Sequence, residues 1–211
     1  MMRWIGIGLC GALAACGGGR HAPVRPAVTP VVTSQEEPAW RSTISPGDAL
    51  RLEGLPARWA AAQAGLERRG RATVASEGDL LRGDAALDHA ALPPGSYKCR
   101  LLVMSGRVVR SFPAFFCYVG SEDGERLSFT KQTGSALPGG WLYPDGTKRY
   151  VFMGARQKQA GDGSLGYGED PERDLFGVVE RIGPFRWRLV LPGEDLQVYE
   201  LTPVPVEQQA K

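Results

Sequence analysis

The chain has 211 residues and a formal net charge of +2, from 25 Lys and Arg against 23 Asp and Glu. Because the two signs are interspersed, this balance favours neither a nucleic-acid partner nor an anionic membrane surface. There are only two histidines, His21 and His89, which argues against histidine-based zinc sites and Ser-His-Asp or Cys-His nucleophiles. We predict no cofactor, no metal and no catalytic residue, and we lean against an enzyme.

The N-terminus has the form of a secretory signal. A short basic start, Met1 to Arg3, precedes an uncharged and mostly apolar run up to Ala15, which is too short to span a bilayer as a helix. The run ends in Leu13-Ala14-Ala15-Cys16, which resembles the bacterial lipobox. We therefore predict a lipoprotein signal peptide over residues 1–15 and a lipid on Cys16. By the same resemblance, Gly17 in place of aspartate favours the outer membrane.

Residues 16–38 are expected to be a tether. Three glycines follow Cys16, and four prolines then occur among few large apolar residues, at positions 23, 26, 30 and 38. Such a segment cannot bury enough surface to offset its ordering entropy. At about 3.1 Å per residue it would hold a domain roughly 60 Å from the lipid.

A single globular domain is predicted for residues 39–205, with a helical part over 39–92, a β part over 93–203 and a tail over 206–211. Ser45-Pro46 is typical of a helix start, since serine can cap and proline fits the first turn. A break near Gly54 and Pro56 predicts a helical hairpin. The run Glu67 to Gly70 is expected to close the second helix, with arginines at the negative end of the dipole and glycine as the stop.

From Gly95 onward, short apolar and aromatic runs alternate with turn residues, which is the all-β pattern. About eight strands are expected, and they favour a mainly β, α+β fold in which the helical hairpin precedes an antiparallel up-and-down barrel. A β-sandwich is the second possibility. The expected strands are 96–104, 111–119, 125–131, 141–143, 149–155, 175–182, 185–191 and 196–201.

Cys99 and Cys117 are expected to form one disulfide in an oxidising compartment. If they lie directly opposite each other in a hairpin, Val103 faces Pro113, Ser105 faces Ser111, and the loop falls on residues 106–110. A redox role is less favoured, because the CxxC spacing that tunes such pairs is missing.

The segment Arg156 to Asp174 is rich in glycine and ends in Asp170-Pro171-Glu172-Arg173-Asp174. Long loops without their own secondary structure are often functional. Oxygen ligands for calcium are conceivable here, at Asp162, Ser164, Glu169, Asp170 and Asp174, but the spacing does not match an EF-hand. Asp170 is better explained as a helix N-cap. Tyr167, Asp170, Arg173 and Asp174 are candidate ligand-binding residues.

The stretch VVERIGPFRWRLVLP, residues 178–192, predicts two strands around a Gly183-Pro184 turn. In that register Glu180 lies on the interior face beside Trp187, and Arg181, Arg186 and Arg188 lie outside. An inward carboxylate needs a hydrogen bond, a cation or a raised pKa. A structural salt bridge, to Arg100 or Arg173, is the favoured interpretation, and contact with a ligand is the alternative. All five of these motif residues, Glu180, Arg181, Arg186, Trp187 and Arg188, are candidate ligand-binding positions.

A set of motif residues is spread over the domain: Trp40, Asp48, Pro93 to Arg100, Cys117, Asp170, Arg173, Asp174, Glu180 to Gly183 and Arg186 to Leu189. In these residues the chain resembles an uncharacterised family of secreted proteobacterial proteins, a domain of unknown function. The resemblance covers roughly residues 40–203 and implies an envelope protein in which Cys99 and Cys117 belong to the design, without any assigned activity. In plan, a lipoprotein with a small barrel held by a disulfide is also similar to bacterial inhibitors of lysozyme and of secreted proteases.

The sequence thus predicts a lipoprotein of the outer membrane with its domain in the periplasm. The favoured function is a non-catalytic binding module for a protein, a cell-wall component or a small apolar ligand. The alternatives are a structural lipoprotein of envelope assembly and a hydrolase that uses carboxylates such as Glu180, Asp170 and Asp174. The expected partners are the membrane, through the lipid, and an envelope protein or small ligand.

Overall fold

The computed structural model describes residues 37–121, 126–134, 137–158 and 166–208. They belong to one compact unit, Glu36–Lys211. The signal peptide, Cys16 and nearly all of the predicted tether lie outside the described residues. Within the described ranges, no helix is both long enough and apolar enough to cross a membrane.

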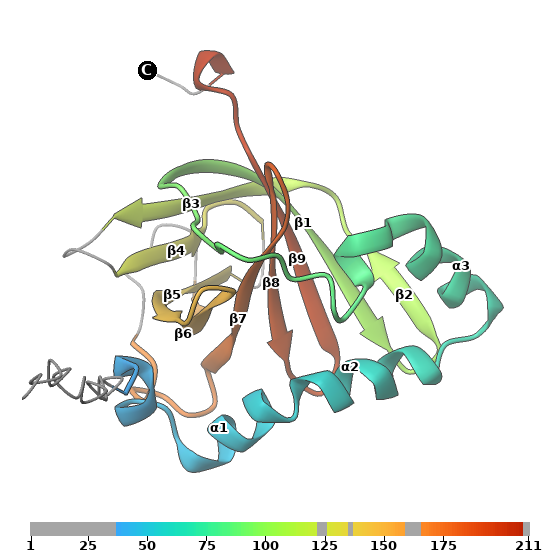
Figure 1. Ribbon diagram of the computed structural model, residues 1–211, viewed down its shortest axis with the longest axis horizontal. Helices are drawn as coiled ribbons and strands as arrows, with labels where there is room; N and C mark the ends of the chain where they lie inside the picture. Colours follow the sequence, from blue (N-terminus) through green and yellow to red (C-terminus); the bar gives the residue numbers. More distant parts are fainter. Residues whose placement is uncertain (1–36, 122–125, 135–136, 159–165, 209–211) are drawn as a thin grey trace, which may run out of the picture. The chain divides into compact units, whose positions relative to one another are not determined.

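The helical part begins as the sequence predicts (Figure 1). The Ser45 hydroxyl accepts a hydrogen bond from the Asp48 backbone N–H at 3.2 Å, so serine caps the helix. Gly54 separates the first two α-helices. The elements are η1 (Ala39–Ser42), α1 (Pro46–Glu53), α2 (Leu55–Ala64), α3 (Arg68–Glu77) and η2 (Gly78–Leu81).

The predicted end of the second helix at Gly70 is wrong. Helix α2 ends at Ala64, and the arginines that follow open a third helix, α3. Gly70 is needed for close packing: a Cβ there would lie 3.1 Å from the backbone oxygen of Arg107. The Glu67 N–H also donates to the Arg107 carbonyl at 3.0 Å. The glycine therefore marks where α3 touches a hairpin turn.

The β part is an antiparallel sheet that closes on itself. From β3 to β9, strands adjacent in sequence are adjacent in space, and β1 pairs with both β3 and β9. Eight strands therefore form an up-and-down barrel, as predicted, and β2 is an extra strand paired with β1. The strands are β1 (Gly95–Ser105), β2 (Val108–Ser111), β3 (Phe115–Ser121), β4 (Leu127–Lys131), β5 (Leu137–Asp145), β6 (Arg149–Gln157), β7 (Asp174–Gly183), β8 (Arg186–Pro192) and β9 (Leu196–Pro203).

The register predicted around the two cysteines is wrong. Tyr97 pairs with Cys117, and Cys99 pairs with Phe115, so the cysteines are diagonal neighbours on β1 and β3. Ser105 pairs with Val108 across a tight turn. The single strand expected over 111–119 is interrupted around Pro113, between β2 and β3. Both cysteines are buried free thiols in the structure, so the disulfide stays a prediction. Burial, with a hydrogen bond to Cys99, raises the pKa of the Cys117 thiol.

Two apolar cores lie on opposite faces of the sheet. One receives residues from all eight barrel strands, so it fills the interior; its largest members include Tyr97, Phe129, Phe152, Trp187 and Tyr199. The other packs Trp40, Leu52, Trp59, Leu80 and Leu81 from the helical part against the outside of β1 and β6–β9. The helical part is thus one covering layer on the barrel wall (Figure 1).

The barrel wall requires a close backbone approach between β5 and β6. Gly140 and Gly154 are directly opposed across the two strands. A Cβ on Gly154 would overlap the Gly139 carbonyl oxygen and the Gly140 Cα. Glycine at this pair lets the wall curve tightly.

Candidate ligand groove

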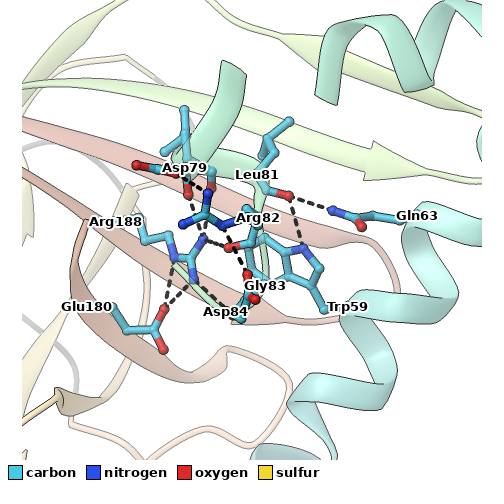
Figure 2. Close-up of polar contacts among 10 residues, drawn as sticks. Trp59, Gln63, Asp79, Leu81, Arg82, Gly83, Asp84, Glu180 and Arg188 are labelled. Atoms are coloured by element: carbon cyan, nitrogen blue, oxygen red, sulfur yellow. Dashed lines mark hydrogen bonds and ion pairs between the residues drawn. The ribbon is translucent and has the colours of Figure 1, made fainter. Parts of the chain in front are cut away.

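The motif over residues 178–192 holds a buried ion pair between Glu180 on β7 and Arg188 on β8 (Figure 2). The Arg188 side chain is 0% exposed and that of Glu180 is 13% exposed. Nε and Nη2 of Arg188 donate to the same carboxylate oxygen at 2.9 and 2.7 Å. The carboxylate is therefore already matched by a cation from its neighbouring strand.

The rest of the Arg188 guanidinium holds η2 and the two residues after it, which we call the η2 segment (residues 78–83), against the barrel wall. Nη1 donates to the carbonyls of Asp79, Leu80 and Arg82 at 3.1, 3.1 and 2.6 Å, and Nη2 donates to Gly83 at 3.3 Å. The guanidinium carbon also lies 4.6 Å from the centre of a Trp59 ring. Figure 2 shows the carbonyls converging on this one side chain. Arg188 is thus a scaffold residue that a ligand does not reach.

A β-bulge explains why the sequence placed Glu180 wrongly. The register shifts between Arg181 and Gly183, so Glu180 lies opposite Arg188. A shift of one residue moves side chains to the other face of a sheet. Glu180 therefore points to the helix-covered face, while Trp187 belongs to the barrel interior. The salt bridge was predicted, but its partner is Arg188 in place of Arg100 or Arg173.

The other candidate arginines of this motif also have structural contacts. Arg186 pairs with Glu200 at 2.6 Å, and the other oxygen of Glu200 lies 2.7 Å from Arg100. Arg100 in turn forms two hydrogen bonds with Glu77 at the end of α3, at 2.8 and 2.6 Å. Arg181 donates to the Asp88 carbonyl at 2.6 Å. Arg186 and Arg100 therefore pair with acids, and Arg181 is hydrogen-bonded to a backbone carbonyl.

A different set of residues lines an open groove between α1 and the turn that precedes β7. The Tyr167 hydroxyl donates to the Asp48 carboxylate, across 119 residues of sequence. It also accepts from the Ser45 N–H at 3.1 Å. Burial, together with the hydrogen bond to Asp48, raises the pKa of Tyr167. These contacts hold the turn against the first helix.

Charged groups of both signs line this groove, which has a volume of about 450 Å³. Arg51 lies 3.2 Å from Asp48 and keeps a side chain that is 64% exposed. Its guanidinium carbon is 5.5 Å from the centre of the Phe176 ring. Opposite, Asp174 accepts a hydrogen bond from the Gly168 N–H at 2.9 Å. We call this hollow the α1 groove; it is lined by Thr43, Ser45, Asp48, Arg51, Tyr167, Gly168, Pro171, Asp174 and Phe176.

A second hollow of about 320 Å³ shares Arg51, Asp174 and Phe176 with the α1 groove. It adds Arg156 and the β8–β9 turn, Gly193 to Asp195. The two hollows therefore form one continuous surface across three segments: α1, the turn before β7, and the β8–β9 turn.

Asp170 and Arg173 support the turn rather than the groove itself. The Asp170 side chain accepts from the Glu172 N–H at 3.3 Å, and its backbone carbonyl accepts from the N–H groups of Arg173 and Asp174 at 2.8 and 3.1 Å. No helix follows, so the predicted N-cap is a turn cap. Arg173 donates to the Arg156 carbonyl. Asp162 and Ser164 lie outside the described residues. Across the described ranges, no three His, Cys, Asp or Glu side chains are grouped closely enough to hold a metal ion.

Sequence reasoning therefore found Tyr167 and Asp174 but missed Arg51 and Phe176. Asp48 was named among the motif residues of the family resemblance but was not a candidate for ligand binding. The available signal was an acid three residues after a capping serine, at a motif position. Nothing local indicates that Arg51 and Phe176, from α1 and β7, line the same groove.

The fold and groove define a small closed β-barrel with a helical covering layer and a polar groove at the edge of that layer. The chain matches the family model described as "Domain of unknown function (DUF4893)" over residues 40–201. It belongs to this family, in agreement with the resemblance noted from its motifs. No curated protein and no solved structure gives a significant match to the chain.

Proposed function

We propose that this chain is a lipid-anchored protein of the outer membrane whose periplasmic domain is a non-catalytic binding module. We place its ligand in the α1 groove. The observation that carries this proposal is the convergence of Asp48, Arg51, Tyr167 and Asp174 from distant segments on one open hollow. Grooves with a few convergent polar groups are the usual places for ligands.

The barrel interior does not support a site. Large aromatic side chains from several strands occupy it: Tyr97 is 1% exposed, Phe129 and Phe152 are 0% exposed, and Tyr199 is 2% exposed. Trp187 packs edge-on against Tyr97, with ring centres 6.2 Å apart, and donates to the Ala90 carbonyl at 3.2 Å. We therefore do not place the small apolar ligand considered above inside the barrel.

The chemistry of the groove favours a polar ligand that carries both signs of charge. Arg51 and Arg156 offer cations, Asp174 offers a carboxylate, and Phe176 adds an apolar surface. A peptide segment of an envelope protein or of the cell wall has this combination. Its carboxylates would pair with the arginines, and its ammonium or amide groups would donate to Asp174.

A carboxylate-dependent hydrolase is the weaker proposal. Glu180, the most attractive buried acid in the sequence, has both a cationic partner and a covering layer. Asp170 caps a turn. The envelope-assembly alternative predicts a deletion phenotype of leaky membranes that only the lipidated form rescues.

Capture from envelope extract tests the groove. We expect native mass spectrometry to find a retained mass on the domain Glu36–Lys211, and the double variant Arg51→Gln/Asp174→Asn to lose it with its melting temperature nearly unchanged. A suitable control is Asp88→Asn/Lys148→Gln, which removes an exposed ion pair elsewhere; the Lys148 side chain is as exposed as that of Arg51, at 64%. Equal capture by both variants would contradict the assignment of the ligand to the groove.

Lipidation has its own test. The variant Cys16→Ala should stay full-length and unlipidated, because alanine has no thiol to carry the lipid. Mass spectrometry of the membrane fraction checks this, with Cys10→Ala as the control, since Cys10 lies in the segment expected to be removed. Release of a mature, diacylated form from Cys16→Ala would overturn the anchor.

A further inference from the structure

A cluster of arginines lies where α3 meets the β1–β2 hairpin. A hollow of about 290 Å³ lies between the helix and the strand. It is lined by Arg69 and Gly70 of α3 and by Val108, Val109 and Arg110 of β2. Figure 1 shows α3 beside β2 at one end of the domain. We call this region the α3–β2 surface; its arginines are Arg68, Arg69, Arg71, Arg107 and Arg110.

Acidic residues of the protein neutralise only part of this positive charge. Arg107 pairs with Glu67 at 3.1 Å, but both side chains are mostly exposed, and Arg110 is 3.9 Å from Asp195. Exposed pairs of this kind are weak and screened by salt. Arg68 and Arg69 have no ion pair within the part of the chain that the structure describes. The surface is left with an excess of positive charge.

This placement of the arginines is unfavourable for the helix. Arg68, Arg69 and Arg71 lie in the first turn of α3, where the helix dipole already presents positive charge, and the first turn contains no acid. The residue before the helix, Glu67, does not cap it with its side chain. Positions that break a local rule in this way are often retained for function.

An exposed apolar side chain lies beside two of the arginines. Val108 of β2 is 46% exposed and lines the hollow together with Arg69 and Arg110. A surface that docks here must therefore accept guanidinium groups next to an apolar side chain. The headgroup region of an anionic bilayer has this composition, with phosphates above acyl chains.

We propose that the α3–β2 surface binds an anionic phospholipid bilayer, with arginines on the phosphates and Val108 at the level of the acyl chains. This goes beyond the groove's ligand and uses different residues. A tether of the predicted length leaves the domain free to reach the bilayer to which Cys16 is anchored. Membrane attachment would then have two components, a lipid and a basic surface, a combination that gives stable anchoring.

Vesicle flotation tests the proposal without the lipid anchor. The domain Glu36–Lys211, which forms a compact unit of its own, is mixed with vesicles of phosphatidylcholine alone or of an equal mixture with phosphatidylglycerol. We expect binding only to the anionic vesicles, decreasing with added salt. Arg68→Glu/Arg69→Glu should weaken it about tenfold or more, since each cation near the surface contributes measurably. Val108→Ser should lower the part of the binding that resists salt.

The control is Arg41→Glu/Lys148→Glu, which makes the same change in net charge at exposed positions outside this surface. It should bind nearly as the unmodified domain does. Equal binding to both kinds of vesicle, no binding to either, or equal losses in the two double variants would overturn the proposal. Binding to polyglutamate without binding to vesicles would also overturn it and assign the surface to an acidic protein. None of these outcomes bears on the α1 groove.

Discussion

The variant Arg188→Ala should lose about 3–5 kcal/mol of unfolding free energy, the cost of breaking a buried charge pair. Alanine would leave the Glu180 carboxylate, whose side chain is only 13% exposed, without its cation. The carbonyls of Asp79, Leu80, Arg82 and Gly83 would lose their donor. It would also remove the contact with Trp59. The segment that joins the helices to the barrel wall would then be held by far fewer interactions.

Urea denaturation followed by circular dichroism measures this loss. Arg82→Ala is the matched control, because Arg82 lies in the same region but its side chain is 60% exposed and pairs with Asp79 and Asp84 on the surface. We expect that control to lose no more than about 1 kcal/mol. A loss of that small size in Arg188→Ala would show that the buried pair does not hold the covering layer in place.

The second large effect is expected at the barrel wall. Gly154→Ala should destabilise the domain by about 1–3 kcal/mol or more, because overpacking forces backbone movement where none is available. The added methyl would overlap the backbone of β5 at Gly139 and Gly140. The strands cannot separate without breaking the ladder that closes the barrel.

Thermal unfolding of Gly154→Ala and Gly47→Ala gives the comparison. Gly47 lies in α1, and a Cβ there would meet no atom within 4 Å. Alanine favours helix over glycine by about 0.5–1 kcal/mol, so the control should keep or gain stability. Equal melting temperatures in the two variants would mean that the wall tolerates a side chain at Gly154.

Most of the fold could be predicted from the sequence. Alternating apolar residues between turn signals located most of the strands, and Ser45-Pro46 located the first helix. The errors arose where tertiary packing, and not the local sequence, determines where an element ends. Gly70 is typical of a helix stop in sequence, but it is a close contact with Arg107, and Pro113 divides a run that periodicity alone joins.

The bulge between Arg181 and Gly183 has the largest consequence for the site. Its one-residue shift moves Glu180 from the interior to the covered face and gives it Arg188 as a partner. No composition or spacing indicates a bulge at this point. The most recognisable motif of the chain is therefore scaffold, while the groove takes residues from α1 and from the turn before β7 that no local pattern connects.

The overall charge balance does not describe how charge is distributed over the surface. The formal net charge of +2 predicts no preference for an anionic membrane, but five arginines are gathered around α3 and the β1–β2 hairpin. Because the sequence suggested a helix end at Gly70, Arg68 and Arg69 seemed to complement a helix dipole that they in fact oppose. The corrected helix boundary is therefore one of the observations behind the proposal that this surface binds an anionic bilayer.

In our proposal a ligand binds in the α1 groove and not within the barrel. Hydrogen–deuterium exchange of the domain, with and without the envelope component that it retains, tests this most directly. We predict new protection in residues 45–51 and 166–176, with exchange in β8, residues 186–192, unchanged. Protection confined to β3, where Phe116 and Tyr118 are exposed, or to the interior strands would contradict the account.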